Sequence, residues 1–196
     1  IRGLQSYKQQ VTVAHPGSRT AVNITGIEKR DVTRGHVLTK PDQLHPTLLA
    51  DVYFRHLPDA GRPLKHNSEI KVFSGTAESV ARVRLLDDET LAPGAEGWLQ
   101  LRLESPLPLA RSDRYILRYP SPPQTIGGGT IVDPHPRRRW KRFRPEVIDR
   151  LATQIQGSPA QRIAQVAEGT APLKRVHLQQ QTGYGDTELD AALQAA

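Results

Sequence analysis

The chain contains no cysteine, which excludes a disulfide framework and any thiolate metal site. Aromatic residues make up only 5% of the sequence, so a hydrophobic core must be built mainly from aliphatic side chains. No apolar run approaches the ~18 residues of a membrane-spanning helix, and the first residues carry no signal-peptide pattern. These absences fit a cytoplasmic protein without a membrane partner.

An initiator methionine is also missing, and the chain opens inside a strand-like segment, which predicts a piece of a longer protein. What the 196 residues do contain is 16 prolines and 15 glycines, a composition typical of many turns and short strands. The net charge is +7, which suits a polyanionic partner such as a nucleic acid. A merely soluble basic surface is the alternative explanation.

Period-two alternation of apolar and polar residues predicts antiparallel strands through the middle of the chain. We expect them at residues 49–57, 68–74, 79–86, 97–104, 113–119 and 125–132. Leu99, Leu101 and Leu103 would face inward, with Trp98 and Gln100 on the opposite face. This spacing indicates a small barrel or sandwich. Residues 1–40 also look like β structure but are too few to close a barrel, so we expect part of one.

The period becomes helical after Pro145. A first helix should end near Gly157, a second near Gly169, a third should span Leu173–Gln181, and a fourth should start near Asp186. Helices joined by short glycine-containing turns are typical of a helix-turn-helix. One hypothesis is therefore a DNA-binding regulator, but residues 186–196 contain no lysine or arginine, which argues against a DNA-reading helix.

The stretch Gly127-Gly128-Gly129 raises the question of a phosphate-binding loop. Such a loop needs a following lysine and helix, and neither is present. Glycines between strand-like residues instead allow close backbone approach or a bend at a barrel corner. The preceding prolines, Pro120 to Pro123, predict a rigid exposed rim that could dock a partner with little loss of entropy.

No catalytic or metal-binding constellation is evident. The seven histidines follow no ligand spacing, and Asp87-Asp88-Glu89 has no base or oxyanion motif beside it. The sequence therefore predicts no catalytic residues, no metal ligands and no enzyme activity in this chain.

Residues 137–144 are strongly basic, with two aromatic residues among the charges. Their basic members are Arg137, Arg138, Arg139, Lys141, Arg142 and Arg144. Arginines take phosphate oxygens bidentately, and Trp140 and Phe143 could stack on bases. The alternative is a solvated joint whose aromatics pack against the neighbouring domains.

Several quoted stretches resemble translational GTPases of the elongation factor Tu class, and most closely the bacterial selenocysteine-specific elongation factors. "PGSRTAVNITGIEKRDVTRGHVL" (16–38) resembles the end of their second domain, and "SDRYILR" with "TIGGGTIVDP" resembles the closing strands of their third. "IRGLQSY", "NSEIKVFSGTAESVARVRLL", "LATQIQGSP" and "QTGYGDTELDAALQ" strengthen the likeness.

This resemblance implies a mainly β fold in four parts. Residues 1–42 would be the C-terminal half of the second-domain barrel, 47–134 the third-domain barrel, 135–144 a basic linker and 145–196 the helical start of a winged-helix domain. The parent would be a GTPase whose missing N-terminal domain holds GTP and magnesium. It would deliver selenocysteinyl-tRNA to the ribosome at recoded UGA codons, and missing C-terminal domains would bind a messenger RNA hairpin.

The resemblance also assigns roles to residues. Arg19 matches the arginine that lines the selenocysteine pocket, where a cation would favour the ionised selenol over a serine hydroxyl; spacing alone would make it an ordinary surface arginine. The loop that grips tRNA corresponds to Tyr119 to Gln124, with Thr125. The expected tRNA-binding residues are therefore Tyr119, Pro122, Pro123, Gln124 and Thr125.

Overall fold

The computed structural model describes residues 1–167 and 174–195, which fall into two compact units, Ile1–His36 and Val37–Ala196. The first unit holds a three-stranded antiparallel sheet in the order β2-β1-β3. Its elements are β1 (Gly3–Ser6), β2 (Gln9–Val11), β3 (Ala21–Asn23) and the 3-10 helix η1 (Lys29–Asp31). The β character expected for this part of the chain is present, although the strands are short.

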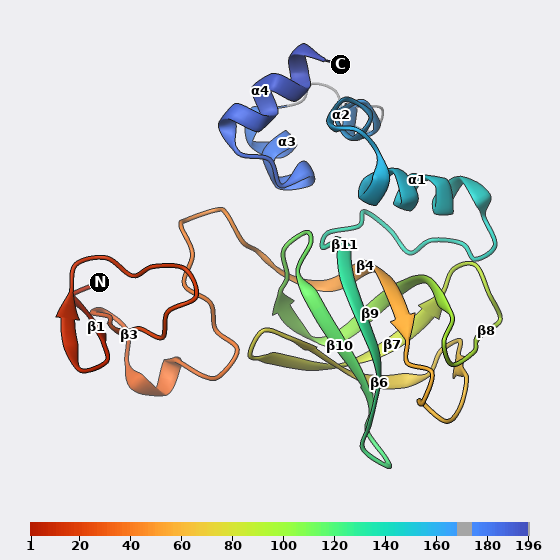
Figure 1. The fold of residues 1–196 in the computed structure, drawn as a ribbon, viewed down its shortest axis with the longest axis horizontal. Helices are drawn as coiled ribbons and strands as arrows, with labels where there is room; N and C mark the ends of the chain where they lie inside the picture. Colours follow the sequence, from red (N-terminus) through yellow and green to blue (C-terminus); the bar gives the residue numbers. More distant parts are fainter. Residues whose placement is uncertain (168–173, 196) are drawn as a thin grey trace. The chain divides into compact units, whose positions relative to one another are not determined.

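The second unit is built on a closed barrel of six antiparallel strands in the order β10-β11-β4-β9-β7-β6 (Figure 1). The barrel strands are β4 (Pro46–His56), β6 (Glu69–Ser74), β7 (Ala77–Leu85), β9 (Glu96–Pro108), β10 (Arg114–Tyr119) and β11 (Gln124–Asp133). A small two-stranded sheet pairs β5 (Leu64–Lys65) with β8 (Thr90–Leu91). The predicted barrel is confirmed, with each expected strand recovered to within a few residues at most ends.

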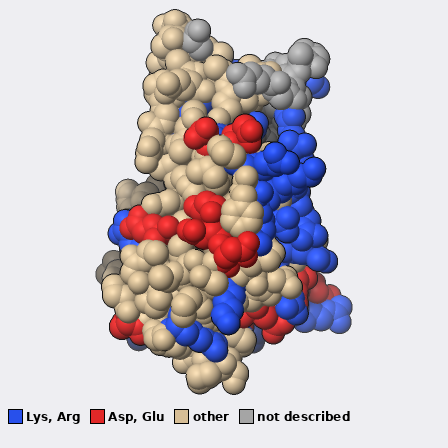
Figure 2. All heavy atoms as spheres, turned by 90° about the vertical axis from the view of Figure 1, so that its right-hand side faces the viewer, with Lys and Arg blue, Asp and Glu red and all other residues tan. Residues whose placement is uncertain are grey.

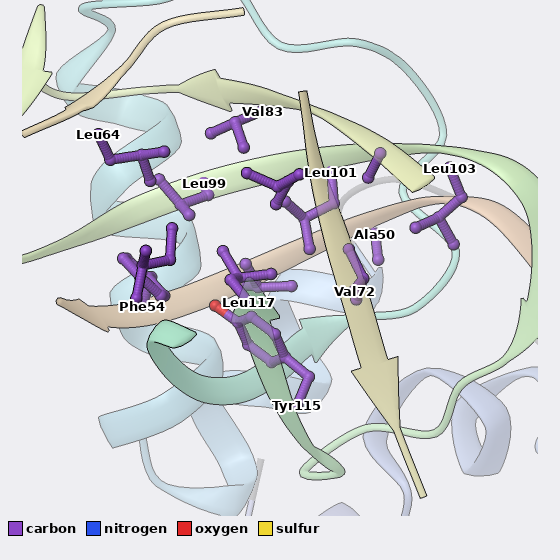
Figure 3. Close-up of a cluster of buried hydrophobic side chains, with 14 of the residues drawn as sticks. Ala50, Phe54, Leu64, Val72, Val83, Leu99, Leu101, Leu103, Tyr115 and Leu117 are labelled. Carbon is purple, nitrogen blue, oxygen red and sulfur yellow. The ribbon is translucent and has the colours of Figure 1, made fainter. Parts of the chain in front are cut away.

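The barrel core is aliphatic, as the low aromatic content requires. Val72, Leu99, Leu101 and Leu117 are fully buried, with Phe54 and Tyr115 as the largest aromatic members of the core (Figure 3). Because side chains alternate across a strand, every second residue of β4, β7 and β9 points into this core. Burying this apolar surface is the main stabilising term for the barrel.

The opposite face of β9 departs from the prediction. Trp98 is only 8% exposed and Gln100 only 1% exposed, although alternation placed both outside. Trp98 belongs to a second apolar cluster that covers part of the barrel's outer face, and Gln100 is hydrogen-bonded to Trp140 of the same cluster. Its buried members are Leu86, Trp98, Val132, Trp140 and Leu151. This part of the outer face is therefore buried as well, because the linker and the first helix cover it.

The three glycines of β11 lie where neighbouring strands approach very closely. A Cβ on Gly129 would overlap the carbonyl oxygen of Tyr53, and one on Gly128 would lie 2.5 Å from that of Tyr115. Gly127 has φ +154, and a Cβ there would meet the side chain of Phe54. The structure therefore supports a role in barrel closure rather than in phosphate binding.

Four helices follow the barrel: α1 (Pro145–Gln156), α2 (Pro159–Ala167), α3 (Arg175–Thr182) and α4 (Asp186–Gln194). Ile163, Leu178, Tyr184 and Leu189 form a small core between the last three. Gly183 adopts φ 75 between α3 and α4, the left-handed turn typical of a glycine after a helix. The expected ends at Gly169 and Leu173 lie outside the described residues. None of the described helices has the length and apolarity to span a membrane.

Candidate nucleic-acid interface

The β10–β11 hairpin carries the residues that the sequence predicted to contact RNA. The two strands pair directly, with Tyr119 opposite Gln124, and the register shifts between Leu117 and Arg118. The hairpin projects beyond the ends of the other barrel strands (Figure 1). Pro120, Pro122 and Pro123 are exposed at its tip, so a proline-restricted backbone faces solvent.

Two of the predicted hairpin residues are engaged within the protein. The Tyr119 side chain is 5% exposed, donates to the carbonyl oxygen of Pro63 at 3.4 Å, and lies under the Arg62 guanidinium at 3.9 Å. Gln124 is half-buried, and its amide donates to the carbonyl oxygen of Asp59 at 3.4 Å. The Tyr119 ring therefore supports the hairpin from beneath and offers no surface for RNA, whereas Thr125 is exposed beside it.

The basic linker is attached to the barrel through Trp140. The indole Nε1 of Trp140 donates to the Asp51 carboxylate at 2.6 Å, and the backbone nitrogen of Trp140 donates to Gln100 Oε1 at 3.2 Å. The Gln100 amide in turn donates to Asp51 at 2.8 Å and to the carbonyl oxygen of Arg138 at 3.1 Å. Trp140 is buried, so it cannot stack on a base, and the interpretation as a packed joint holds for this residue.

Asp51 is fully buried in this network, and burial raises its pKa to about 7, with the Asp133 charge adding to the rise. The hydrogen bonds from Trp140 and Gln100 act in the opposite direction. Sequence reasoning did not find this network, because Asp51 and Trp140 are far apart in the chain. The only signal was an acidic residue inside an otherwise apolar strand.

The charged side chains of the linker fall into two groups. Arg142 is held against the barrel by the carbonyl oxygens of Leu85 at 2.9 Å and Asp88 at 2.7 Å, and by Glu89 at 3.1 Å. The remaining basic side chains lie on the surface: Arg137, Arg138, Arg139, Lys141 and Arg144. Figure 2 shows lysine and arginine side chains gathered in a band along one edge of that view. The linker therefore combines an anchored arginine with an exposed cationic surface.

Arg19 lies two residues before the start of β3, and its side chain is exposed. The hydroxyl of Ser6 donates to its carbonyl oxygen at 3.2 Å. The hollow in this unit is lined by residues of β1 and β3, such as Leu4, Val22 and Asn23, and not by Arg19.

In the acidic turn after β7, Asp87 and Glu89 make contacts that stabilise the fold. Asp87 accepts a hydrogen bond from the backbone nitrogen of Trp98 at 3.3 Å, and burial raises the pKa of its carboxyl group. Glu89 pairs with Arg142. Across residues 1–167 and 174–195, no three acidic or histidine side chains gather in a way that could hold a metal ion.

The helices give little support to a DNA-reading role. Arg175 at the start of α3 is paired with Asp190 at 2.6 Å and Asp186 at 3.5 Å, and these pairs raise its pKa. An arginine held by two carboxylates of the next helix is poorly placed to meet a base edge. The short glycine turn between α3 and α4 fits a helix-turn-helix, but these ion pairs argue against the regulator hypothesis.

Comparison with known proteins places the barrel in a class and then in a family. A crystal structure of a bacterial selenocysteine-specific elongation factor matches with a TM-score of 0.72 at 19% identity, covering 96% of this chain and 29% of that one. The fold is therefore that of the elongation factor β-barrels. Residues 53–138 match the family model "Selenocysteine-specific elongation factor, beta-barrel domain". This chain contains a β-barrel domain of the selenocysteine-specific elongation factor family.

Two curated relatives carry the same description. The selenocysteine-specific elongation factor of Desulfomicrobium baculatum is 40% identical over 138 residues, which are 70% of this chain and 22% of the relative. That of Escherichia coli strain K12 is 30% identical over 154 residues, or 78% of this chain and 23% of the relative. The chain thus spans less than a quarter of the length of either relative.

Proposed function

We propose that this chain is the tRNA-binding portion of a selenocysteine-specific elongation factor. The observation that carries the proposal is the exposed, proline-rich β10–β11 hairpin on a closed barrel of this family. A rigid edge loses little conformational entropy on binding, so the free energy gained from its contacts is offset less by the ordering of the loop. Pro122, Pro123 and Thr125 form this edge, and Gln124 can contribute through its backbone.

We infer that the whole factor is a GTPase that delivers selenocysteinyl-tRNA to the ribosome at recoded UGA codons. GTP and magnesium would bind an N-terminal domain outside this chain, and a messenger RNA hairpin would bind further C-terminal domains. Within the chain, residues 1–42 would complete a second-domain barrel, 47–134 form the third domain, 135–144 link the domains, and 145–196 begin a winged-helix domain.

The exposed cations of the linker would add phosphate contacts. Arg137, Arg138, Arg139, Lys141 and Arg144 are surface residues, and arginine binds phosphate oxygens with two parallel hydrogen bonds. Arg142 would act by fixing the linker to the barrel. Arg19 would face the selenol of the aminoacyl group once the rest of its domain is present.

A salt titration of tRNA binding tests the proposal. Each phosphate contact releases counterions, so the binding constant should fall steeply as salt increases. A tRNA affinity that does not change with salt would count against phosphate contacts.

Placing a carboxylate beside a bound phosphate should weaken tRNA binding by about tenfold, because like charges repel in the interface. We therefore expect Thr125→Glu to reduce tRNA affinity.

Thr76→Glu is the matched control, since Thr76 is an exposed threonine in the β6–β7 turn at the other end of the strands. It should leave affinity within about twofold of the parent chain, as expected for a charge beyond a Debye length of the RNA. Equal losses in the two variants would contradict the hairpin as the RNA-binding edge.

A further inference from the structure

A crevice on the outer face of the barrel gathers three arginines of β7 and β9 that sequence reasoning did not single out, together with Arg139 of the linker. It lies between β7, β9, the β5–β6 turn and the linker. Its charged and polar walls are Arg82, Arg84, Arg102, Arg139, His66 and Asn67. Alternation puts the strand arginines on one face of each strand, but only the β7–β9 register brings them together.

The positive charge of the crevice is only partly balanced. Arg82 lies directly opposite Arg102 in the β7–β9 register, an arrangement of like charges that destabilises a sheet. Arg82 pairs with Glu69 at 3.0 Å, but both side chains are about half exposed, so this pair is weak. Within the described parts of the chain, no carboxylate pairs with Arg102 or Arg139. A bound anion would relieve this repulsion.

The inner wall is also suited to an anion. Arg84 donates its Nε to the carbonyl oxygen of Trp140 at 2.8 Å, which fixes the guanidinium in place. Burial, and then Arg139 and Arg142, lower the pKa of Arg84. The Nδ1 atom of His66 is buried and has no hydrogen-bond partner among the described residues. Burial lowers the pKa of His66, and so do Arg142, Arg84 and Arg139, while Glu89 opposes them.

We propose that this crevice binds the phosphate backbone of RNA, as a second contact separate from the β10–β11 hairpin. In the strand order β10-β11-β4-β9-β7-β6, the β7–β9 pair lies across the barrel from β10–β11. One straight duplex arm therefore cannot touch both faces. The exposed linker cations Arg138 and Lys141 continue the charge beyond the crevice, which suits a string of phosphates better than a single small anion.

The test uses this chain and a short RNA duplex as the probe, with Arg82→Ala and Arg102→Ala combined in one variant, since neither arginine belongs to the linker. Removing two phosphate contacts should lower affinity by about tenfold or more and reduce the slope of log K against log salt by about 2. The matched control is Arg30→Ala with Arg34→Ala, which removes the same charge from exposed positions in the other unit. The control should change the slope by much less.

The hairpin variant Thr125→Glu separates this inference from the proposed function on which it builds. If the crevice variant loses RNA binding and Thr125→Glu does not, the crevice site holds and the hairpin fails. If only Thr125→Glu loses binding, the crevice proposal is overturned. If the crevice variant and its charge-matched control lose the same affinity, the effect is one of net charge and the proposal is also overturned.

A last experiment compares inorganic phosphate with the RNA duplex. The pKa of the His66 ring is measured by NMR in the presence of each. When the RNA duplex binds, its phosphate charges should offset those of the nearby arginines and so raise the pKa of His66. Inorganic phosphate at the same ionic strength should raise this pKa by less. A pKa of His66 that rises to a plateau with inorganic phosphate but does not change with the duplex would contradict an RNA site. It would indicate a small-anion site instead.

Discussion

Asp51 shows how one buried carboxylate joins two parts of the chain. It accepts hydrogen bonds from Trp140 Nε1 and from the Gln100 amide, and Gln100 also holds the Trp140 and Arg138 backbones. A buried carboxylate without such donors would be very costly. The network therefore fixes the course of the basic linker over the barrel.

We expect Trp140→Phe to lower the free energy of unfolding by about 1–3 kcal/mol, because it leaves a buried acceptor without one of its donors. Chemical denaturation of the chain measures this. Trp98→Phe is the control: Trp98 packs in the same cluster and makes no side-chain hydrogen bond to the described residues. An equal loss in both variants would mean that packing, and not the bond to Asp51, is what matters.

The pKa of Asp51 also predicts a pH dependence. Its pKa is about 7 in the folded protein and 3.8 without the fold, so the folded state binds the proton more tightly. The stabilisation is therefore fully present below pH 3.8 and is lost as the pH rises through 7. Compared with Asp51→Asn, the unfolding free energy of the parent chain should fall by up to about 1.4 kcal/mol per pH unit in this window.

Denaturation at a series of pH values checks this trend. Glu104→Gln, a substitution of an exposed carboxylate, is the control variant. A difference between the parent and Asp51→Asn that stays constant from pH 4 to pH 7 would show that Asp51 keeps an ordinary pKa.

Alternation in the sequence identified the inward residues of β4 and β9 correctly, since Val52, Phe54, Leu99 and Leu101 are all in the core. It failed for the opposite face of β9, where Trp98 is buried. The period of a strand tells which residues share a face, but not whether a distant segment covers that face. Trp140 covers this one, from about forty residues away in the chain.

Strand β11 is the element whose sequence is most constrained by its neighbours. Its glycines let β4 and β10 approach so closely that a Cβ on Gly128 or Gly129 would meet a neighbouring carbonyl oxygen. The sequence predicted this use of glycine from the flanking strand-like residues. It could not tell which backbone would come close, because that depends on the register of the closed barrel.

We expect Gly129→Ala to cost about 3 kcal/mol or more of unfolding free energy, because the added methyl group forces β4 and β11 apart. Thermal or chemical denaturation provides the measurement. Gly3→Ala is the control: no atom lies within 4 Å of a Cβ at Gly3, so its effect should be within about 0.5 kcal/mol. If the barrel tolerated Gly129→Ala as well as Gly3→Ala, closure would not depend on these glycines.

The whole chain carries a net charge of +7, and both the linker and the barrel crevice present basic side chains. The linker and the arginine crevice lie on the β7–β9 side of the barrel. The proline-rich β10–β11 hairpin lies on the opposite side. The composition predicted a polyanionic partner. The resemblance to the elongation factor family predicted the hairpin, whereas the crevice emerged only from the three-dimensional pairing of β7 with β9.

The most direct test of the account is to map the backbone amide NMR shifts of this chain as selenocysteine tRNA is added. The account predicts that the largest changes fall on Ser121, Gln124 and Thr125 of the hairpin, with further changes in residues 137–144. The β6–β7 turn at Gly75 and Thr76 should stay unchanged. Shifts that spare the hairpin while the β6–β7 turn responds would contradict it.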